Sequence, residues 1–393
     1  MARPIYSIPV LLLAGVQLSH VLDFVILMPL GPMLTRALGI STQSFSWLVS
    51  VYTLSAALSC LLAAFVMDRF DRKKVLVLIY SGLVLGTFMC AASTNFELLL
   101  AARVITGFFG GLLQSIILAI VGDIVPADHR GRATGTIMAA FAVSSVVGVP
   151  LGLAIANKYG WQATFFAIAG FSLVNLGLVM WRVPKLDGHI GTDDKSSIAS
   201  EFANLMKSPT TWTAWMLIIS MMSVFGMFPF ISQFIVQILG IDESRLPQIY
   251  LVQGLATMIA APLMGRLSDL FGAKKVFIIC SVLSTFFVTW FTHLETATLL
   301  TVITLNTVMA AIGIGRMTPS MDLISRSVIA RKRGSFMTLV AAVQQLAASG
   351  AAYAGGVILS GHKGMAAFPV VGLLVAATMA LSVGVSAKMI TVE

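Results

Sequence analysis

Charged residues are scarce in this sequence. Aspartate, glutamate, lysine and arginine make up only 10% of the 393 residues, whereas soluble domains carry about 25%. Apolar residues make up 58%, and the mean hydropathy is +0.95. A chain so poor in charge cannot cover itself with a soluble surface. The composition therefore excludes a soluble enzyme or binding domain and predicts a polytopic membrane protein.

Cysteine is also rare, and several catalytic signatures are missing. Cys60, Cys90 and Cys280 lie far apart in apolar segments, without metal-ligand or disulfide spacing, so we expect small buried thiols. There is no Gly-x-x-x-x-Gly-Lys-Ser/Thr phosphate loop, no His-Glu-x-x-His and no nucleophile elbow. These absences argue against an ATP-driven motor and a hydrolase. We expect no enzyme activity, no metal and no cofactor.

Long apolar segments fill most of the chain. A helix needs about 20 apolar residues to cross roughly 30 Å of hydrocarbon. Twelve segments have this length: 8–34, 43–66, 75–93, 97–123, 132–156, 161–183, 210–238, 247–267, 275–292, 297–323, 334–360 and 364–387. The first lacks a clear small-x-small cleavage site, so we expect no removable signal. The pattern predicts an all-α membrane protein with twelve transmembrane helices.

One long polar stretch divides these segments into six and six. It covers residues 184–208 and is rich in Asp, Lys, Ser and Gly. It is too short for a domain, so we expect a flexible cytoplasmic linker with at most one surface helix. The expected domains are an N-terminal six-helix bundle over residues 1–183 and a C-terminal six-helix bundle over residues 209–393.

A short polar sequence occurs twice between apolar segments. Residues 67–75 read MDRFDRKKV and residues 268–276 read SDLFGAKKV, with five of nine positions identical at an offset of 201. Residues 130–132 and 333–335 repeat the arrangement at an offset of 203. Repeats at half-chain spacing predict two pseudo-symmetric halves, related by an axis along the membrane normal, with a pathway between them.

Lysine and arginine are distributed unevenly among the loops. With a cytoplasmic N-terminus, 19 of the 25 basic residues lie on the cytoplasmic side, four outside and two within the membrane. Because basic loops stay in the cytoplasm, we expect both termini to be cytoplasmic in a cell inner membrane. This distribution explains the net charge of +9 without a nucleic-acid partner.

Polar residues interrupt the first apolar segment. Gln17, His20 and Asp23 share one helix face at three-residue spacing. A buried carboxylate is costly unless it is paired or protonated. If its surroundings alternate between these states, Asp23 can carry a proton from one side to the other. His20 can titrate in the physiological range. A purely structural role for Asp23 or His20 stays open.

The repeated loop resembles a family signature. Residues 64–74, AFVMDRFDRKK, are similar to the pattern Gly-x-x-x-Asp-Arg-x-Gly-Arg-Arg/Lys of the major facilitator superfamily, and residues 265–275, GRLSDLFGAKK, keep both of its glycines. In the first copy Ala64 and Asp71 replace these glycines. Aspartate is among the few residues other than glycine that tolerate a left-handed turn, so Asp71 can still adopt one. The resemblance implies the major facilitator fold of two six-helix bundles.

Arg103-x-x-x-Gly107 resembles a second motif of that superfamily. Residues 22–32 and Gly148-Val-Pro150-Leu-Gly152 resemble its bacterial drug and sugar exporters that run as proton antiporters. The resemblance implies that Arg103 is the counter-charge of Asp23 in proton coupling, and that residues 148–152 bend and seal the fifth helix. Packing of Arg103 and a generic kink in the helix are the structural alternatives.

The resemblance also implies a gate built from loop charges. The loop aspartates would contact a helix N-terminus, where the dipole favours negative charge, and the loop arginine would pair with an acid at the end of the fourth helix. The residues in these positions are Asp68, Arg72, Asp123 and Asp269. Simple anchoring of the cytoplasmic face is the alternative interpretation.

Polar groups at membrane depth must find partners, and some are expected to bind substrate. The candidates are Gln17, Gln114, Gln233, Gln237, Gln253, Asn306, Arg316 and Gln344. Arg316 either binds an anionic group of the substrate or pairs with Asp322. Many Met and Phe residues favour an apolar or amphiphilic compound instead, and the two indications disagree.

Together these features predict a proton-coupled secondary transporter that exports a small drug-like, amphiphilic or sugar-like compound by alternating access, of the multidrug efflux kind. An uptake symporter or a facilitator with the same fold stays open, as does a receptor-like or lipid-handling protein that does not pump. A membrane enzyme would need a catalytic constellation that is not visible. The expected partners are the substrate, protons and the lipid bilayer. A monomer is expected, because the fold needs no partner.

Overall fold

The computed structural model describes residues 7–66, 70–187, 209–328, 333–361 and 364–389. In these ranges all regular structure is helical, and no strand occurs. Eleven helical segments in the same ranges are long and apolar enough, by length and composition, to cross a membrane. Large apolar side chains such as Leu78, Leu173 and Leu300 lie exposed along them, as expected for helices that face lipid. The all-α membrane architecture is therefore confirmed.

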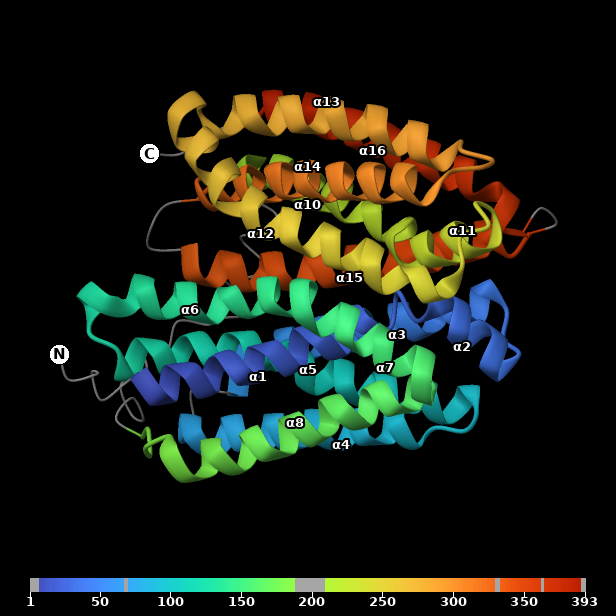
Figure 1. The fold of residues 1–393 in the computed structure, drawn as a ribbon. Coiled ribbons are helices and arrows are strands. Elements are labelled where there is room, and N and C mark those ends of the chain that lie inside the picture. Colours follow the sequence, from blue (N-terminus) through green and yellow to red (C-terminus); the bar gives the residue numbers. More distant parts are fainter. Residues whose placement is uncertain (1–6, 67–69, 188–208, 329–332, 362–363, 390–393) are drawn as a thin grey trace. The chain divides into compact units, whose positions relative to one another are not determined.

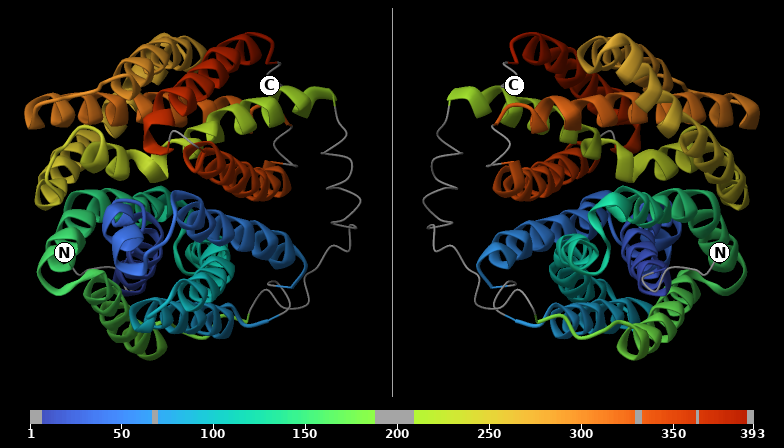
Figure 2. Two further views of the ribbon diagram at one scale, coloured as in Figure 1. Left: turned by 90° about the vertical axis from the view of Figure 1, so that its right-hand side faces the viewer. Right: turned by 90° about the vertical axis from the view of Figure 1, so that its left-hand side faces the viewer.

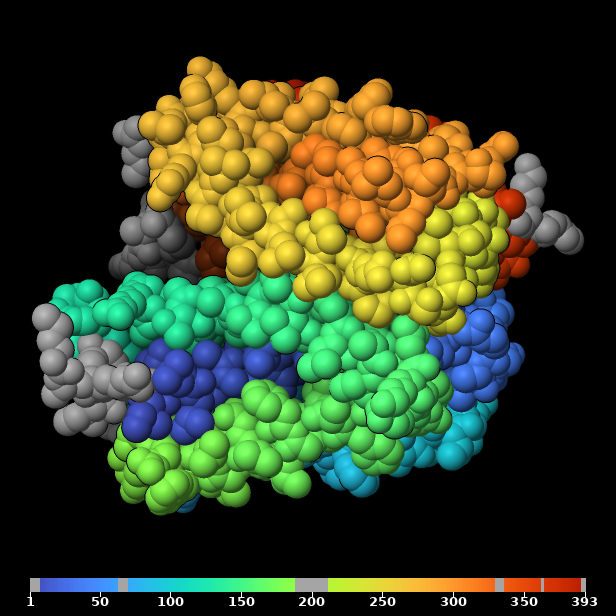
Figure 3. All heavy atoms as spheres, viewed as in Figure 1, coloured from blue at the N-terminus to red at the C-terminus, as the bar shows by residue number. Residues whose placement is uncertain are grey.

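One compact unit comprises residues Met1–Leu27 and Val51–Lys195. Its helices are α1 (Ser7–Ile26), the later part of α3 (Thr42–Val66), α4 (Arg72–Ala92), α5 (Phe96–Ile124), α6 (Arg130–Val143), α7 (Val149–Tyr159) and α8 (Trp161–Arg182). Helix α4 packs along α5 and α8, and α1 packs against α6 and α8; Figures 1 and 2 both show α4 beside α8. In the view of Figure 3, side chains of α1, α6, α7 and α8 form the surface of this unit. Leu13, Leu113 and Val179 belong to its apolar core.

A second compact unit comprises residues Met28–Ser50 and Ser196–Glu393. Its helices are α2 (Gly31–Leu38), the first part of α3, α10 (Pro209–Met222), α11 (Ile231–Gln237), α12 (Leu246–Phe271), α13 (Ala273–Thr292), α14 (Leu299–Ser325), α15 (Arg333–Leu359) and α16 (Phe368–Ala387). Helix α14 packs against α12 and α13, while α10 packs against α15 and α16. Helix α2 packs on α11, and Arg36 forms an ion pair with Glu243. Residues 28–50 therefore group with helices that follow them much later in the sequence.

The first expected segment, 8–34, is not one continuous helix. Helix α1 ends at Ile26, and α2 begins at Gly31 with Pro32 in its first turn. Proline suits the first turn of a helix, where its missing N–H leaves no bond unmade, but it disrupts a helix interior. The expectation of a single helix was wrong for this reason.

Two other expected helices are interrupted near a proline. The fifth, 132–156, contains a π-helical turn at Ser144–Gly148, in which the Val149 N–H donates to the Ser144 carbonyl, just before Pro150. Such a turn is a common cause of helix bending. The seventh, 210–238, passes through two 3₁₀ turns, Ser223–Gly226 and Phe228–Phe230, on either side of Met227.

Helix α15 corresponds to the eleventh expected segment, 334–360. It has 27 residues, which is long enough to cross a membrane. It is nevertheless not among the eleven most apolar spans found in the described ranges, because Gln344, Gln345 and many alanines and glycines dilute its larger apolar side chains. The twelve expected segments are thus all helical, with α15 the least typical of them.

The two copies of the repeated loop have different backbones. Asp71 has φ −53° and ψ 119°, and its carboxylate accepts a hydrogen bond from the Lys73 N–H as the N-cap of α4. Gly272, at the matching position, has φ +87°. Asp71 therefore does not adopt the left-handed turn that aspartate tolerates: its side chain caps the helix, and its backbone stays in an ordinary region. Asp68 and most of the linker lie outside the described residues.

Candidate functional site

A fully buried ion pair joins α1 to α5. The Arg103 Nη1 atom lies 3.0 Å from Asp23 Oδ2, and both side chains have no solvent exposure. The same nitrogen donates to the Asp23 carbonyl at 3.2 Å. A pair removed from water in this way stays charged only if each partner compensates the other. The contact brings together two residues that the sequence singled out 80 positions apart.

Other side chains complete the surroundings of this pair. The Thr87 hydroxyl of α4 donates to Asp23 Oδ1 at 2.9 Å. The Arg103 guanidinium lies 4.4 Å from the centre of the Tyr52 ring, which favours a cation over its face. Tyr52 also shares a hydrogen bond of 3.2 Å with His20 Nδ1. Asp23, Arg103, Thr87, Tyr52 and His20 form what we term the Asp23 cluster.

Small residues allow these side chains to meet. A Cβ atom on Gly107 would lie 2.3 Å from the Tyr52 carbonyl, and one on Gly110 would lie 2.6 Å from the Tyr52 hydroxyl. Larger residues at these positions would push α3 away from α5. The Arg103-x-x-x-Gly107 pattern therefore has a local explanation: one turn supplies the cation and the next lets Tyr52 reach it.

The bent fifth helix packs on α1 beside the Asp23 cluster. A Cβ atom on Gly148 would lie 2.8 Å from a Leu22 methyl group, and one on Gly152 would lie 2.9 Å from Ile26. The Thr164 hydroxyl donates to the Gly152 carbonyl at 2.7 Å. Pro150 is buried between these glycines. Gly148 and Gly152 thus contact α1 on either side of Asp23.

Arg103 keeps unused hydrogen-bonding capacity. Its Nε and Nη2 atoms are buried and have no hydrogen-bond partner among the residues that the structure describes. If Asp23 accepted a proton, the charge attraction that holds Arg103 would be lost, and these donors would favour a new partner. The cluster is therefore able to couple the charge of one carboxyl group to the position of an arginine.

A second buried arginine lies in the other unit and forms no ion pair with any carboxylate in the described ranges. Arg316 of α14 is 3% exposed, and its Nε donates to the Ser281 hydroxyl of α13 at 3.1 Å. Its Nη2 atom is buried without a partner. The sequence left open a pair with Asp322, but Asp322 accepts instead from Arg326 Nε at 2.9 Å on its own helix.

The uncharged candidates fall into three groups. Asn306 donates to Gln253 at 2.7 Å, and Gln344 donates to the Met321 sulfur at 3.7 Å, which joins neighbouring helices in each case. Gln17 and Gln233 are buried and keep amide atoms without partners. Gln114 and Gln237 are exposed. They do not form one cluster, and any role in binding a substrate stays a prediction.

The predicted gating residues are partly in contact. Arg72, in the first turn of α4, pairs with Asp123 near the end of α5 at 2.5 Å, and it donates to the Ala119 carbonyl at 3.3 Å. Asp269 is exposed near the end of α12. The side chains at the start of α15 lie outside the described residues, so the expected contact at that helix end stays a prediction.

Two members of the Asp23 cluster were not foreseen. Thr87 and Tyr52 lie in apolar segments that contain many other hydroxyl-bearing residues, such as Ser50, Thr53 and Ser55. Hydroxyl groups in membrane helices often bond to their own backbone, so their presence alone carries little information. Only their placement beside Asp23 and Arg103 distinguishes these two residues.

Comparisons with known proteins agree with this architecture. The family model described as Major Facilitator Superfamily matches residues 13–252 and 213–390. A "Probable sugar efflux transporter" of Helicobacter pylori (strain ATCC 700392 / 26695) is 26% identical over 234 residues, which is 59% of this chain and 57% of that protein. The chain spans about three fifths of the length of the curated relatives it matches.

Solved structures share the fold over nearly the whole chain. A bacterial homologue of the human lysosomal transporter Spinster, inward-facing and occupied, superposes with a TM-score of 0.80 at 13% identity and covers 99% of this chain and 97% of its own. A D-xylose–proton symporter gives 0.78 at 15% identity, with 98% and 99% covered. Because the family model matches both halves of the chain, the chain belongs to the major facilitator superfamily.

Proposed function

We propose that this transporter exports a small compound in exchange for protons, by alternating access across a bacterial inner membrane with both termini in the cytoplasm. The observation that carries the proposal is the buried ion pair of Asp23 with Arg103 at 3.0 Å. An intramembrane carboxylate held by a single arginine is costly to keep and is a typical part of a proton pathway. In the proposed cycle, Asp23 alternates between two states: ionised and paired with Arg103, or protonated.

The cluster's geometry supports this exchange. A proton on Asp23 removes its charge and frees Arg103, whose Nε and Nη2 atoms have no partner in the charged state. The hydroxyl of Thr87 stays able to bond either form of the carboxyl group. His20 lies one turn before Asp23 on α1 and is hydrogen-bonded to Tyr52, so it is the proposed next proton carrier after Asp23. One proton that crosses a 100 mV potential supplies about 2.3 kcal/mol to the transport of substrate.

The outward direction is proposed from two independent supports. The fifth helix packs tightly on α1 through Gly148 and Gly152, with Pro150 buried between them, and this arrangement suits exchange without leak. The relative from Helicobacter pylori carries a name that refers to sugar efflux. The alternatives to export are uptake in symport with protons and facilitated diffusion.

The buried Arg316 supports an acidic group on the substrate. Its Nη2 atom has no partner, and no carboxylate among the described residues pairs with it. Transfer of a lone cation from water is strongly unfavourable, and a negatively charged group bound in one state of the cycle would offset that cost. We therefore favour a small compound with a carboxylate or phosphate group, such as an acidic sugar derivative, over a neutral sugar.

The test is proton release from purified protein in weakly buffered detergent. A panel of neutral sugars, sugar acids, sugar phosphates and cationic amphiphilic dyes is added to wild type, Asp23→Asn and Asp242→Asn. The last is a matched control, because Asp242 is exposed in a loop and asparagine preserves its cap on Ser244. We expect an acidic compound to release protons from wild type and from the control, but not from Asp23→Asn.

Three results would overturn parts of the proposal. Release that persists in Asp23→Asn would exclude this carboxylate as the proton carrier. Binding without release in any protein would favour a facilitator. Substrate accumulation in right-side-out vesicles under an inward proton gradient would favour symport. Arg316→Gln should abolish the preference for acidic compounds; an unchanged preference would exclude Arg316 as their binding residue.

A further inference from the structure

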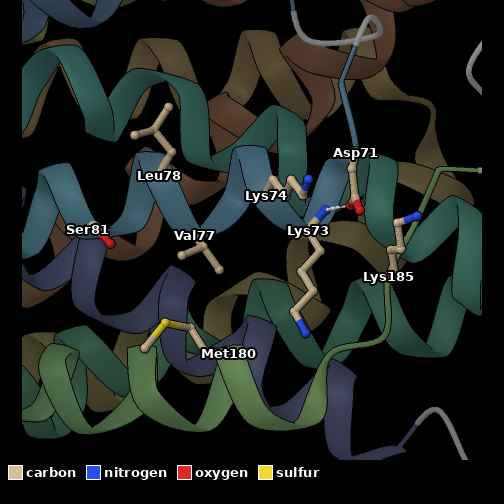
Figure 4. Close-up of a pocket in the computed structure, with 8 residues that line it drawn as sticks. All are labelled: Asp71, Lys73, Lys74, Val77, Leu78, Ser81, Met180 and Lys185. Atoms are coloured by element: carbon tan, nitrogen blue, oxygen red, sulfur yellow. Dashed lines mark hydrogen bonds between the residues drawn. The ribbon is translucent and has the colours of Figure 1, made fainter.

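A pocket of about 580 Å³ lies between the first turns of α4 and the end of α8, and it shares no residue with the Asp23 cluster. Lys73 and Lys74 reach it from α4, and Lys185 reaches it from just beyond α8. Figure 4 shows the Lys73 side chain extending toward α8, with Val77 and Met180 facing each other farther along the two helices. The pocket is therefore basic at one end and apolar along its length.

The position of this pocket at the ends of α4 and α8 predicts that it opens at the boundary between the hydrocarbon and the polar region of the bilayer. Both α4 and α8 are candidate membrane spans. The lysines lie at the terminus of each span, whereas Leu78 and Met180 lie further inside and are 68% and 49% exposed. Trp181, 70% exposed, stacks against Arg182 at the end of α8, and tryptophan with arginine is typical of the membrane interface. An occupant would meet lipid on its open side.

The basic end keeps its positive charge available. In the described part of the chain, neither Lys73 nor Lys74 forms an ion pair. Lys185 pairs with Asp187 on the exposed surface; the hydrogen bond from that carboxylate raises the pKa of Lys185, so the lysine stays charged, and such exposed pairs are weak. The Asp71 Oδ1 atom is already occupied by the N–H groups of Lys73 and Leu186.

We propose that this pocket binds one anionic phospholipid, with its phosphate at Lys73, Lys74 and Lys185 and an acyl chain along Val77, Leu78 and Met180. The three lysines outnumber the single lining carboxylate of Asp71, which favours an anionic over a zwitterionic headgroup. The apolar length would serve no purpose for a free phosphate ion. Basic pockets between membrane helices are suited to this chemistry, and the site goes beyond the proposed transport cycle and does not depend on it.

The experiment measures lipid binding to the detergent-purified protein by native mass spectrometry. The probes are phosphatidylglycerol, phosphatidylcholine with the same acyl chains, and inorganic phosphate as competitor. The variant is Lys73→Gln/Lys74→Gln. Its matched control is Lys274→Gln/Lys275→Gln, the same change in the second copy of the loop, where Lys274 donates to the Ala387 carbonyl.

We expect wild type and the control to bind one phosphatidylglycerol at least tenfold more tightly than phosphatidylcholine. The Lys73→Gln/Lys74→Gln variant should lose about 25-fold in affinity for phosphatidylglycerol, since each basic residue near an anionic surface contributes roughly fivefold, or about 1 kcal/mol. Met180→Ser should weaken binding of the long-chain lipid while leaving a headgroup analogue without acyl chains unaffected.

Several results would overturn the proposal. Equal losses in the variant and its control would indicate general surface attraction. Displacement of the lipid by inorganic phosphate alone would indicate an anion site instead of a lipid site. Equal binding of phosphatidylcholine would exclude recognition of the headgroup charge. None of these results depends on whether Asp23 carries a proton, so failure here leaves the transport proposal intact.

Discussion

Each compact unit contains a buried arginine, and the two arginines differ in their partners. In the first, Arg103 is matched by Asp23 at 3.0 Å and by the ring of Tyr52. In the second, Arg316 has one neutral hydrogen-bond partner, Ser281, and a terminal nitrogen without any. Both arginines lose their hydration on burial, but only Arg103 gains a carboxylate in exchange. The two units therefore carry different polar sites, and the proposed roles of Arg103 in proton coupling and of Arg316 in substrate binding rest on this difference.

The two copies of the repeated loop also differ in their ion pairs. In the first copy Arg72 joins α4 to α5 through Asp123. In the second copy Ala273 stands at the position of Arg72, and Asp322 pairs with Arg326 within one helix. The ion pair of Arg72 thus joins two helices in the first unit, whereas the ion pair of Asp322 in the second unit joins residues four positions apart.

Replacement of each buried arginine should give the largest difference in stability between the two units. Arg103→Gln leaves the Asp23 carboxylate buried and unpaired and should lower the free energy of unfolding by about 3–5 kcal/mol. Arg316→Gln removes a buried charge that has no counter-charge, so stability should be unchanged or higher. Thermal unfolding in detergent measures both, with the exposed Arg326→Gln as reference.

A second variant keeps the arginine prediction testable. Asp23→Asn combined with Arg103→Gln removes both charges, and it should be more stable than Arg103→Gln alone because no lone charge stays buried. Equal melting temperatures for Arg103→Gln and Arg316→Gln would show that the two sites do not differ as proposed.

The two loop positions should respond differently to alanine. Gly272→Ala places a side chain at φ +87° and ψ 136°, a region essentially restricted to glycine, and should cost about 1–3 kcal/mol. Asp71→Ala keeps the backbone but loses the cap on Lys73, which should cost about 0.5–2 kcal/mol. Chemical unfolding of both variants compares them; a larger loss for Asp71→Ala would contradict this order.

Removal of the Tyr52 hydroxyl group, in the Asp23 cluster, should cause the smallest loss of stability. Tyr52→Phe loses the hydrogen bond to His20 but keeps the ring over Arg103, so it should cost about 0.5–1.5 kcal/mol. Tyr52→Leu also removes the ring and should cost about 2 kcal/mol more, because the cation is desolvated. Similar stabilities for the two variants would exclude a contribution from the ring.

Much of the site could be predicted from single residues. Asp23 and Arg103 stood out because ionisable groups are rare in apolar segments, and Gly107, Gly148 and Gly152 because of their spacing within a motif. Thr87 and Tyr52 did not, since neither residue type is unusual in a membrane helix. The Arg316–Asp322 pair was a wrong alternative, because Arg326 lies one turn after Asp322 and is nearer along the helix.

The sequence by itself determined the membrane class and the helical segments, because the apolar length of a segment is a local property that the bilayer selects directly. Tertiary structure alone decided which polar groups meet. Residues 23, 52, 87 and 103 come from four different helices, and their contacts depend on how closely glycines let those helices approach. The break before Pro32, the π turn before Pro150 and the cap at Asp71 were likewise decided by where backbone hydrogen bonds could be completed.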